Sequence, residues 1–120
     1  MTIFRPKIPV RMKYKHNFNK WPISCLLDSG ADFNLFPAKW GDSVGITVKK
    51  GQELTMFGIG GKNIASYRHN VSLFVNHYSF DTTACFSFEQ DIPLLGRDDF
   101  FKYFTKVIFD QSDLSVTLEY

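Results

Sequence analysis

The sequence predicts an all-β fold with one or two short helices, and three observations support this prediction. Residues 8–15 alternate apolar with polar or charged side chains, residues 23–27 form a mostly apolar run, and residues 58–61 hold three glycines between two strand-like segments. Alternation with a period of two is typical of a strand with one buried face. With 120 residues the chain can bury a core without metal or disulfide cross-links, and we expect a single domain over residues 1–120.

The first part of the chain is expected to form a hairpin followed by a short helix. Residues 8–15 form the first strand, residues 16–19 turn the chain, and residues 23–27 form the second strand. Residues 34–36 then return to the sheet. Pro37 begins a helix that extends to about Asp42, because proline is well accommodated at the first helical position.

The segment Gly58-Ile59-Gly60-Gly61 is expected at the tip of a second hairpin. Strand-like residues 51–57 and 63–75 flank it, and glycine permits the backbone conformations of a tight tip. A plain turn would explain the glycines alone. Ile59, however, is an apolar residue on an otherwise bare tip, where it could contact a substrate or a second chain. Two interpretations therefore stay open, a turn and a flap over a binding site.

The last third of the chain is expected to contain a strand, a short helix and a closing hairpin. Residues 80–88 alternate as in a strand, residues 97–104 show helical spacing, and residues 106–110 and 114–120 read as the two arms of the hairpin. One face of the helix would carry three aromatic side chains, which we expect in the core: Phe100, Phe101 and Phe104.

Composition and charge argue against several classes of partner. The net charge is +2, and the basic residues of strand 8–15 alternate with apolar ones, as on the solvated face of a strand. We therefore expect no nucleic-acid partner. The sequence has no apolar run of membrane-spanning length, and residues 1–6 lack the apolar region of a secretory signal. We expect a cytoplasmic protein with no membrane partner.

The cysteines and histidines do not predict a reactive or metal-binding site. Cys25 and Cys85 each lie in a strand-like apolar stretch, which favours buried free thiols. His16, His69 and His77 lack the spacing of metal ligands, and we expect them at the surface or in loops. The sequence therefore predicts no metal site.

The most informative motif is the segment Cys25-Leu26-Leu27-Asp28-Ser29-Gly30-Ala31-Asp32, in which an apolar strand leads a carboxylate into an Asp-Ser-Gly turn. Ser29 can form a local hydrogen bond, and Gly30 permits the tight backbone that lets the carboxylate lie beside a partner. By itself this motif is a weak signal, because many β-turns use these three residue types for their backbone preferences.

Three segments in this order resemble the retropepsin family of aspartic proteases, namely Leu26 to Asp32, Phe57 to Gly61, and Leu94-Leu95-Gly96-Arg97. The resemblance extends over roughly residues 8–118 and implies a closed β-barrel, the acid protease fold. The end of the chain also resembles one lobe of pepsin-like enzymes, whereas viral retropepsins typically end in one strand. The resemblance implies three groups of site residues: a catalytic turn of Asp28, Ser29 and Gly30, a flap tip of Gly58, Ile59, Gly60 and Gly61, and support beneath the catalytic loop from Leu94, Leu95 and Gly96.

The implied activity is hydrolysis of a polypeptide by a homodimer. Aspartic proteases use two carboxyl groups that share one proton, and this chain has one Asp-Ser-Gly turn, so the second Asp28 would come from another copy. Such a mechanism needs no metal and no organic cofactor. The alternative is a catalytically silent retropepsin-like module that dimerises or binds extended peptides. The intact Asp-Ser-Gly turn and the glycine-rich tip favour the enzyme.

Asp32 and Arg97 are expected to form an ion pair. In retropepsins the matching residues tie the catalytic loop to the start of a helix, and both residue types are present here at the matching places. An arginine at a helix N-terminus is unfavourable unless it has a partner. We expect a buried pair whose loss would destabilise the fold. Asp32 could also contact the substrate backbone.

Overall fold

The computed structural model describes residues 2–3, 7–57 and 61–120 of the chain. The strands of the described ranges are β1 (Thr2–Ile3), β2 (Lys7–Tyr14), β3 (Asn17–Phe18), β4 (Ile23–Leu27), β5 (Leu35–Pro37), β6 (Gln52–Phe57), β7 (Asn63–Val75), β8 (Tyr78–Ser87), β9 (Leu94–Leu95), β10 (Lys106–Asp110) and β11 (Ser115–Glu119). The helices are α1 (Ala38–Ser43) and two single 3₁₀ turns, η1 (Val48–Lys50) and η2 (Phe101–Tyr103). The expected all-β class is confirmed.

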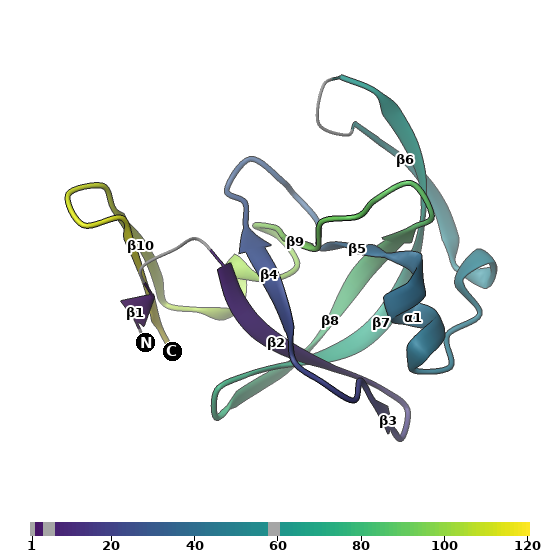
Figure 1. Ribbon diagram of the computed structural model, residues 1–120, viewed down its shortest axis with the longest axis horizontal. Coiled ribbons are helices and arrows are strands. Elements are labelled where there is room, and N and C mark those ends of the chain that lie inside the picture. The colour runs from purple at the N-terminus through teal and green to yellow at the C-terminus, as the bar shows by residue number, and fades with distance from the viewer. Residues whose placement is uncertain (1, 4–6, 58–60) are drawn as a thin grey trace.

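Within the described ranges six strands close into a barrel in the order β2, β4, β9, β5, β8 and β7, and β7 pairs back with β2 (Figure 1). The strands β3 and β6 extend this sheet beyond the closed ring. Closure gives the backbone groups of the ring strands partners on both sides and removes free edges. The closed barrel expected from the family resemblance is therefore confirmed.

Two parallel pairings at the centre of the barrel bring distant loops together. β4 runs parallel to β9, with Leu27 opposite Leu95, and β5 runs parallel to β8, with Phe36 opposite Phe86. Parallel strands end at the same edge of a sheet. The loops that follow β4 and β9 consequently lie side by side, although more than sixty residues separate them in sequence.

The core follows the apolar pattern of the strands. Along β2, Ile8, Val10 and Met12 are fully buried while the residues between them are exposed, as period-two alternation requires. The ring of Trp40 in α1 meets the ring of Phe36 edge to face at 4.5 Å, and this contact fixes the helix on the barrel. Cys25 and Cys85 are buried free thiols, as predicted. No helix in the described part of the chain is long and apolar enough to cross a membrane.

The helix expected over residues 97–104 is reduced to the 3₁₀ turn η2. Phe100 departs from helical backbone angles, with φ −134°. The carbonyl of Asp99 accepts hydrogen bonds from the side chains of Asn34 and Thr82. In a continued helix the same carbonyl would accept from a backbone N–H one turn further along the chain. Phe100 and its neighbour Phe104 still lie in the core, as predicted, because the turn keeps both rings on the inner side.

His69 also differs from its expected place in a loop or at the surface. It lies within β7 and is half-buried, its Nε2 atom is 2.7 Å from the carbonyl oxygen of Val48, and its ring meets the ring of Phe86 at 5.9 Å. The alternation along the long strand β7 turns this residue toward the barrel. His16 and His77 are exposed turn residues, as expected.

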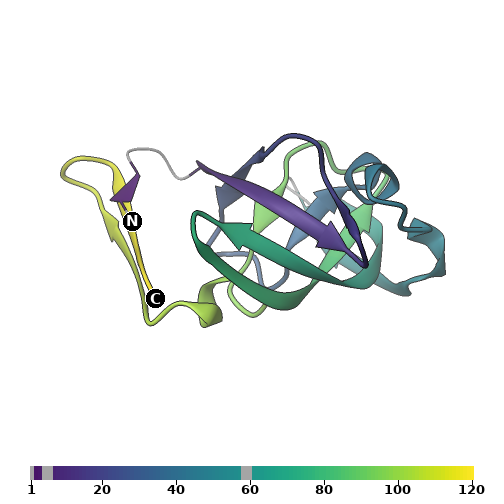
Figure 2. The same ribbon diagram turned by 90° about the horizontal axis from the view of Figure 1, so that it is seen from below.

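The strands β1, β11 and β10 form a separate antiparallel sheet, called the tail sheet below. It stands beside the barrel and holds both ends of the chain (Figure 2). The expected hairpin of the C-terminal residues is confirmed, whereas β1 was not predicted. Val116 and Leu118 join the tail sheet to the main core, and the ring of Tyr120 stacks on that of Tyr78 at 4.5 Å.

Candidate active site

Asp28 opens the loop between β4 and β5, residues 28–34, called the Asp28 loop. Its backbone N–H donates to the carbonyl of Leu95 at 3.0 Å, and its own carbonyl accepts from the N–H of Ala31 at 3.1 Å, which closes a β-turn. The N–H of Gly30 donates to Asp28 Oδ1 at 2.9 Å. The turn therefore orients the carboxylate. A Cβ atom at position 30 would lie 3.3 Å from the same oxygen, so glycine leaves the carboxylate room.

Gly96 lies directly against the backbone of the Asp28 loop. A Cβ atom on Gly96 would stand 2.5 Å from the carbonyl oxygen of Phe33 and 2.7 Å from its backbone nitrogen. Only glycine fits this close approach without a backbone shift. The N–H of Gly96 donates to Asn34 Oδ1 at 3.1 Å. Leu94 and Leu95 precede it in β9 and are buried beneath the loop.

Backbone hydrogen bonds and one ion pair tie the residues after Gly96 to the Asp28 loop. The N–H groups of Arg97 and Asp98 donate to the carbonyls of Ala31 and Asp32 at 2.9 and 2.8 Å. The guanidinium of Arg97 contacts the carboxylate of Asp32, with 2.6 Å between Nη2 and Oδ1. The predicted ion pair is thus present. This hydrogen bond raises the pKa of Arg97 above its ordinary value.

The expectation that this ion pair is buried is wrong. The side chains of Arg97 and Asp32 are 59% and 56% exposed. Water screens such a pair and solvates each partner if the other is lost. The contact therefore cannot hold the two loops together by itself, and the backbone hydrogen bonds beside it carry most of the connection.

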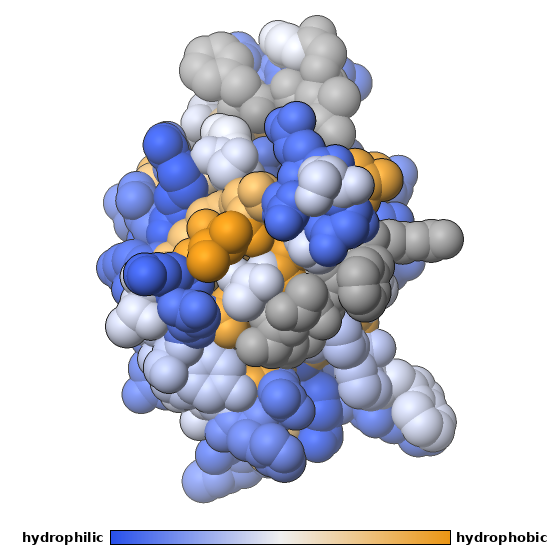
Figure 3. All heavy atoms as spheres, turned by 90° about the vertical axis from the view of Figure 1, so that its left-hand side faces the viewer, coloured by the Kyte–Doolittle hydropathy of each residue, from blue (hydrophilic) through white to orange (hydrophobic). Residues whose placement is uncertain are grey.

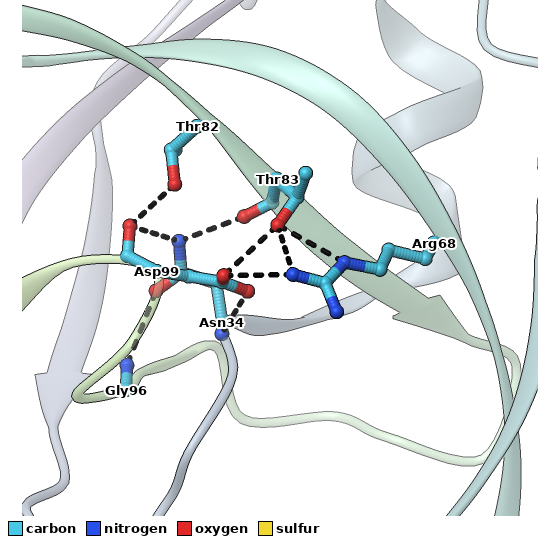
Figure 4. Close-up of polar contacts among 6 residues, drawn as sticks. All are labelled: Asn34, Arg68, Thr82, Thr83, Gly96 and Asp99. Atoms are coloured by element: carbon cyan, nitrogen blue, oxygen red, sulfur yellow. Dashed lines mark hydrogen bonds and ion pairs between the residues drawn. The ribbon is translucent and has the colours of Figure 1, made fainter.

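A second ion pair, which the sequence did not predict, lies beneath the loop (Figure 4). Arg68 from β7 donates from Nη2 to Asp99 Oδ1 at 3.1 Å, and the two side chains are 27% and 3% exposed. Thr83 from β8 donates to the same carboxylate oxygen at 2.9 Å. Burial raises the pKa of Asp99, and the hydrogen bond from Thr83 and the charge of Arg68 oppose that rise.

Asn34 connects this buried pair to the Asp28 loop, as Figure 4 shows. Its backbone N–H donates to Asp99 Oδ2 at 3.2 Å, and its Nδ2 donates to the carbonyls of Thr83 and Asp99 at 3.1 and 3.2 Å. Its Oδ1 accepts from Gly96. Both ends of the side-chain amide are therefore satisfied, as a fully buried amide requires. The end of the loop is fixed from below.

Above the loop lies a groove of about 430 Å³. Asp28, Gly30 and Asp32 line it from the loop, and β6 covers it from the opposite side. Its walls are mainly apolar. The loop also contributes Ala31 and Phe33, and the rest of the lining consists of Leu35, Leu54, Thr55, Met56, Gln90 and Leu94.

The structure brings some predicted site residues together and separates others. Asp28, Gly30, Asp32 and Leu94 share the groove. Ser29 is exposed and lines a different hollow. Gly61 has φ +76° at the entrance to β7. Gly58, Ile59 and Gly60 lie outside the described residues.

Sequence reasoning missed the polar residues beneath the loop, which are Asn34, Arg68, Thr83 and Asp99. One signal was available: Asn34 stands next to the apolar pair Leu35-Phe36, where an uncharged polar residue can be a buried hydrogen-bonding group. Nothing in the sequence distinguishes Asp99 from Asp98, since both follow Arg97. Within the described ranges no group of three or more possible ligands could hold a metal ion.

Comparisons with known proteins identify the fold. No protein-family model matches the sequence, and no curated protein matches it. Among solved structures, a retropepsin-like aspartic protease from Rickettsia conorii is similar over 98% of this chain and 97% of its own, with a TM-score of 0.72 and 17% sequence identity. EIAV protease, complexed with the inhibitor HBY-793, is similar over 78% of this chain and 83% of its own, with a TM-score of 0.59 and 23% identity. The chain therefore has the retropepsin-like fold.

Proposed function

We propose that the chain is one subunit of a homodimeric aspartic endopeptidase in which Asp28 is the catalytic residue. The observation that carries this proposal is the position of Asp28. Its carboxylate is oriented by the N–H of Gly30 and borders a mainly apolar groove. Solved retropepsin-like proteases of similar fold support the proposal at the level of the fold. The argument for catalysis rests on the chemistry of the Asp28 site, because a fold alone does not determine an activity.

The proposed reaction uses one Asp28 from each of two chains. Close carboxyl groups cannot both be ionised and therefore share one proton. The ionised Asp28 takes a proton from a water molecule as the water oxygen attacks the scissile carbonyl carbon. The protonated Asp28 donates a hydrogen bond to the developing oxyanion. Transfer of a proton to the peptide nitrogen then breaks the C–N bond and releases a carboxylic acid and an amine.

The neighbours of Asp28 take supporting roles in this proposal. Gly30 holds Oδ1 in place, and Ser29 forms hydrogen bonds between the two loops beneath the carboxyls. Asp32 contacts the peptide backbone, and the glycine-rich segment Gly58, Ile59, Gly60 and Gly61 contacts the peptide as the family resemblance implies. In the described part of the chain β6 is the last strand of its sheet, and an edge strand beside a groove can receive an extended peptide. EIAV protease, similar in fold, has an inhibitor bound.

The experiment that tests this proposal compares Asp28→Asn with Asp42→Asn. Asp42 is an exposed acid in α1 and does not line the groove, so its variant controls for the loss of a carboxylate. Each protein is incubated with a mixture of random peptides, and the products are identified by mass spectrometry. We expect the wild type and Asp42→Asn to cut peptides and Asp28→Asn to be inactive while it remains folded and dimeric.

Two results would contradict the endopeptidase. Cleavage that survives in Asp28→Asn excludes this residue as the catalytic group. A wild-type protein that binds peptides without cutting them at any pH between 3 and 8, with the same affinity in Asp28→Asn, favours the silent peptide-binding module instead. Peptide affinity measured on the same samples separates the two functions.

A further inference from the structure

A polar hollow of about 460 Å³ lies along one edge of β7 and shares no lining residue with the groove. β8 pairs with residues 67–75 of β7 on one edge, and the other edge is shared by β6, at residues 63–68, and β2, at residues 72–74. Residues 69–71 therefore face no strand of the described chain on this second edge. The hollow, called the β7 gap below, opens there. Its lining residues are Tyr14, Lys50, Gly51, Gln52, Arg68, His69, Asn70 and Thr83.

The lining of the β7 gap is positively charged and rich in hydrogen-bonding groups. Lys50 and Arg68 carry the charge, and the remaining side chains end in amide, hydroxyl or imidazole groups. No carboxylate is found among the described residues that line it. The tail sheet is different, because Figure 3 shows hydrophobic surface in the middle of its face, with hydrophilic side chains around it. Cations and neutral donors without an acidic neighbour favour an anion as the ligand of the β7 gap.

Arg68 offers a donor that the support of the Asp28 loop leaves unused. Its Nε and Nη2 atoms donate to Thr83, and Nη2 also donates to Asp99. The remaining terminal nitrogen, Nη1, has no hydrogen-bond partner in the described part of the chain, and in Figure 4 it points away from Thr83 and Asp99. The guanidinium carbon lies 4.6 Å from the ring centroid of Phe33, which holds the group in place. With five N–H donors, a guanidinium can bind a second anion while it keeps Asp99.

The backbone that carries Lys50 is fixed against β7. Lys50 ends the 3₁₀ turn η1, in which the carbonyl oxygen of Val48 lies 2.7 Å from Nε2 of His69. The next residue, Gly51, approaches β7 so closely that a Cβ atom there would stand 2.5 Å from the carbonyl oxygen of Arg68. Only glycine permits this approach. Lys50 is exposed and has no ion pair within the described ranges. One cation from η1 and one from β7 therefore border the same opening.

We propose that the β7 gap binds a phosphate group, either as free phosphate or as part of a small phosphomonoester. Arg68 donates from Nη1 to a phosphate oxygen, Lys50 supplies the second positive charge, and the side-chain amide of Asn70 donates a further hydrogen bond. Phosphate has more acceptor oxygens and a higher charge than a carboxylate, so it suits two cations and an amide better. A volume of about 460 Å³ also leaves room for the organic part of an ester. This site does not depend on the proposed peptidase activity.

The test compares Lys50→Gln with Lys49→Gln. Lys49 is the neighbouring exposed cation of η1 but does not line the β7 gap, so both variants lose one charge from the same turn. Inorganic phosphate is titrated at constant ionic strength, adjusted with sodium chloride, and backbone amide NMR shifts give the dissociation constant. We expect the wild type to bind phosphate with a dissociation constant of about 1 mM, with the shifts concentrated at the residues that line the gap. Lys50→Gln should bind about tenfold more weakly, and Lys49→Gln like the wild type.

Asn70→Asp tests the site from the side of β7. Asn70 is exposed, and its variant places a carboxylate in the β7 gap, where like charge repels a bound anion. Asn63→Asp is the control, because Asn63 is an exposed residue of the same strand that lies outside the gap. We expect Asn70→Asp to weaken phosphate binding by about tenfold or more and Asn63→Asp to leave it unchanged. Both exposed substitutions should leave the unfolding temperature without phosphate unchanged, which separates lost binding from lost folding.

A titration with glycerol 3-phosphate distinguishes the two sources of the phosphate group. Tighter binding of the ester supports a small phosphorylated molecule as the ligand, and equal or weaker binding supports free phosphate. Shifts that do not saturate below about 50 mM phosphate, or that sodium chloride alone reproduces, overturn the phosphate site. Equal losses of affinity in Lys50→Gln and Lys49→Gln also overturn it, because they indicate a general attraction of anions to the positive charge of the turn. Peptide cleavage by the wild type, present or absent, does not alter these outcomes.

Discussion

Two arginine–aspartate pairs flank the Asp28 loop, one on its open side and one beneath it. Arg97 and Asp32 approach to 2.6 Å with both side chains more than half exposed. Arg68 and Asp99 are 3.1 Å apart, with the carboxylate almost completely buried. The shorter contact is the weaker constraint, because water can solvate either of its partners when the other is removed.

The buried pair differs because its partners have no such replacement. Asp99 accepts hydrogen bonds from Arg68, Thr83 and the backbone of Asn34, and these bonds offset part of the cost of its desolvation. Removing one partner leaves charge or donors unpaired in the interior. The comparison indicates that the Asp28 loop is supported from beneath, while its open side borders the groove.

The largest effect is expected for Asp99→Ala. This change leaves Arg68 without its carboxylate and the N–H of Asn34 without an acceptor, and breaking a buried ion pair costs about 3–5 kcal/mol. The free energy of unfolding, measured by urea denaturation, should fall by about 3 kcal/mol, since Arg68 keeps some access to water. Asp98→Ala is the control, because Asp98 is exposed. Equal losses in the two variants would contradict the supporting role.

A smaller effect is expected in the pH dependence of stability. Burial raises the pKa of Asp99 above the ordinary value of 3.8, so the folded chain holds this proton more tightly than the unfolded chain. Below that ordinary value both states are protonated. As the pH rises from the ordinary value to the raised pKa, the unfolded chain loses the proton while the folded chain keeps it, and the free energy of unfolding declines.

Asp99→Asn removes this titration while it keeps the shape of the side chain. Urea denaturation of both proteins over a pH series gives the difference in their free energies of unfolding. Relative to Asp99→Asn, the wild type should lose stability as the pH rises above about 4 and then level off. A difference in the free energy of unfolding that stays constant with pH, or that grows in favour of the wild type, would contradict a raised pKa for Asp99. It would show that the hydrogen bonds to the carboxylate balance or exceed the effect of burial.

The smallest effect is expected for the exposed pair. Arg97→Ala, Asp32→Ala and the double variant form a thermodynamic cycle for the free energy of unfolding. The coupling between the two residues should be no larger than the error of the measurement. Lys39→Ala, a change at an exposed cation in α1, gives the reference. A loss in Arg97→Ala as large as that in Asp99→Ala would reverse the order of the two pairs.

Local pattern was enough to predict most of the strands and the Asp-Ser-Gly turn, whereas β1, β3 and β9 were not predicted. The predicted strand 23–27 coincides with β4, and the predicted arm 63–75 coincides with β7, because alternation and turn residues are properties of neighbouring positions. The same holds for the turn at Asp28, where the N–H groups of Gly30 and Ala31 both donate to Asp28, two and three residues away. The closed barrel was implied by the resemblance of the three motifs to the retropepsin family.

Helical spacing, in contrast, was misleading over residues 97–104, where side-chain bonds to the carbonyl of Asp99 from Asn34 and Thr82 end the helix. These contacts join parts of the chain that are 65 and 17 residues apart. A helical pattern in the sequence gives no information about side-chain hydrogen bonds from residues so far away along the chain, and these bonds compete with the helix for the Asp99 carbonyl.

The sequence by itself determined which residues alternate, where the chain turns, and that one carboxylate follows an apolar strand. Only the tertiary structure decided that Asp99 faces inward while Asp98 faces solvent, that Arg68 reaches across from β7, and that the pair Arg97–Asp32 is exposed. Burial and long-range hydrogen bonds depend on how the barrel closes. Closure of the barrel brings β7, β8 and the Asp28 loop together. It therefore determines how deeply each charged side chain is buried and how much that side chain contributes to the free energy of unfolding.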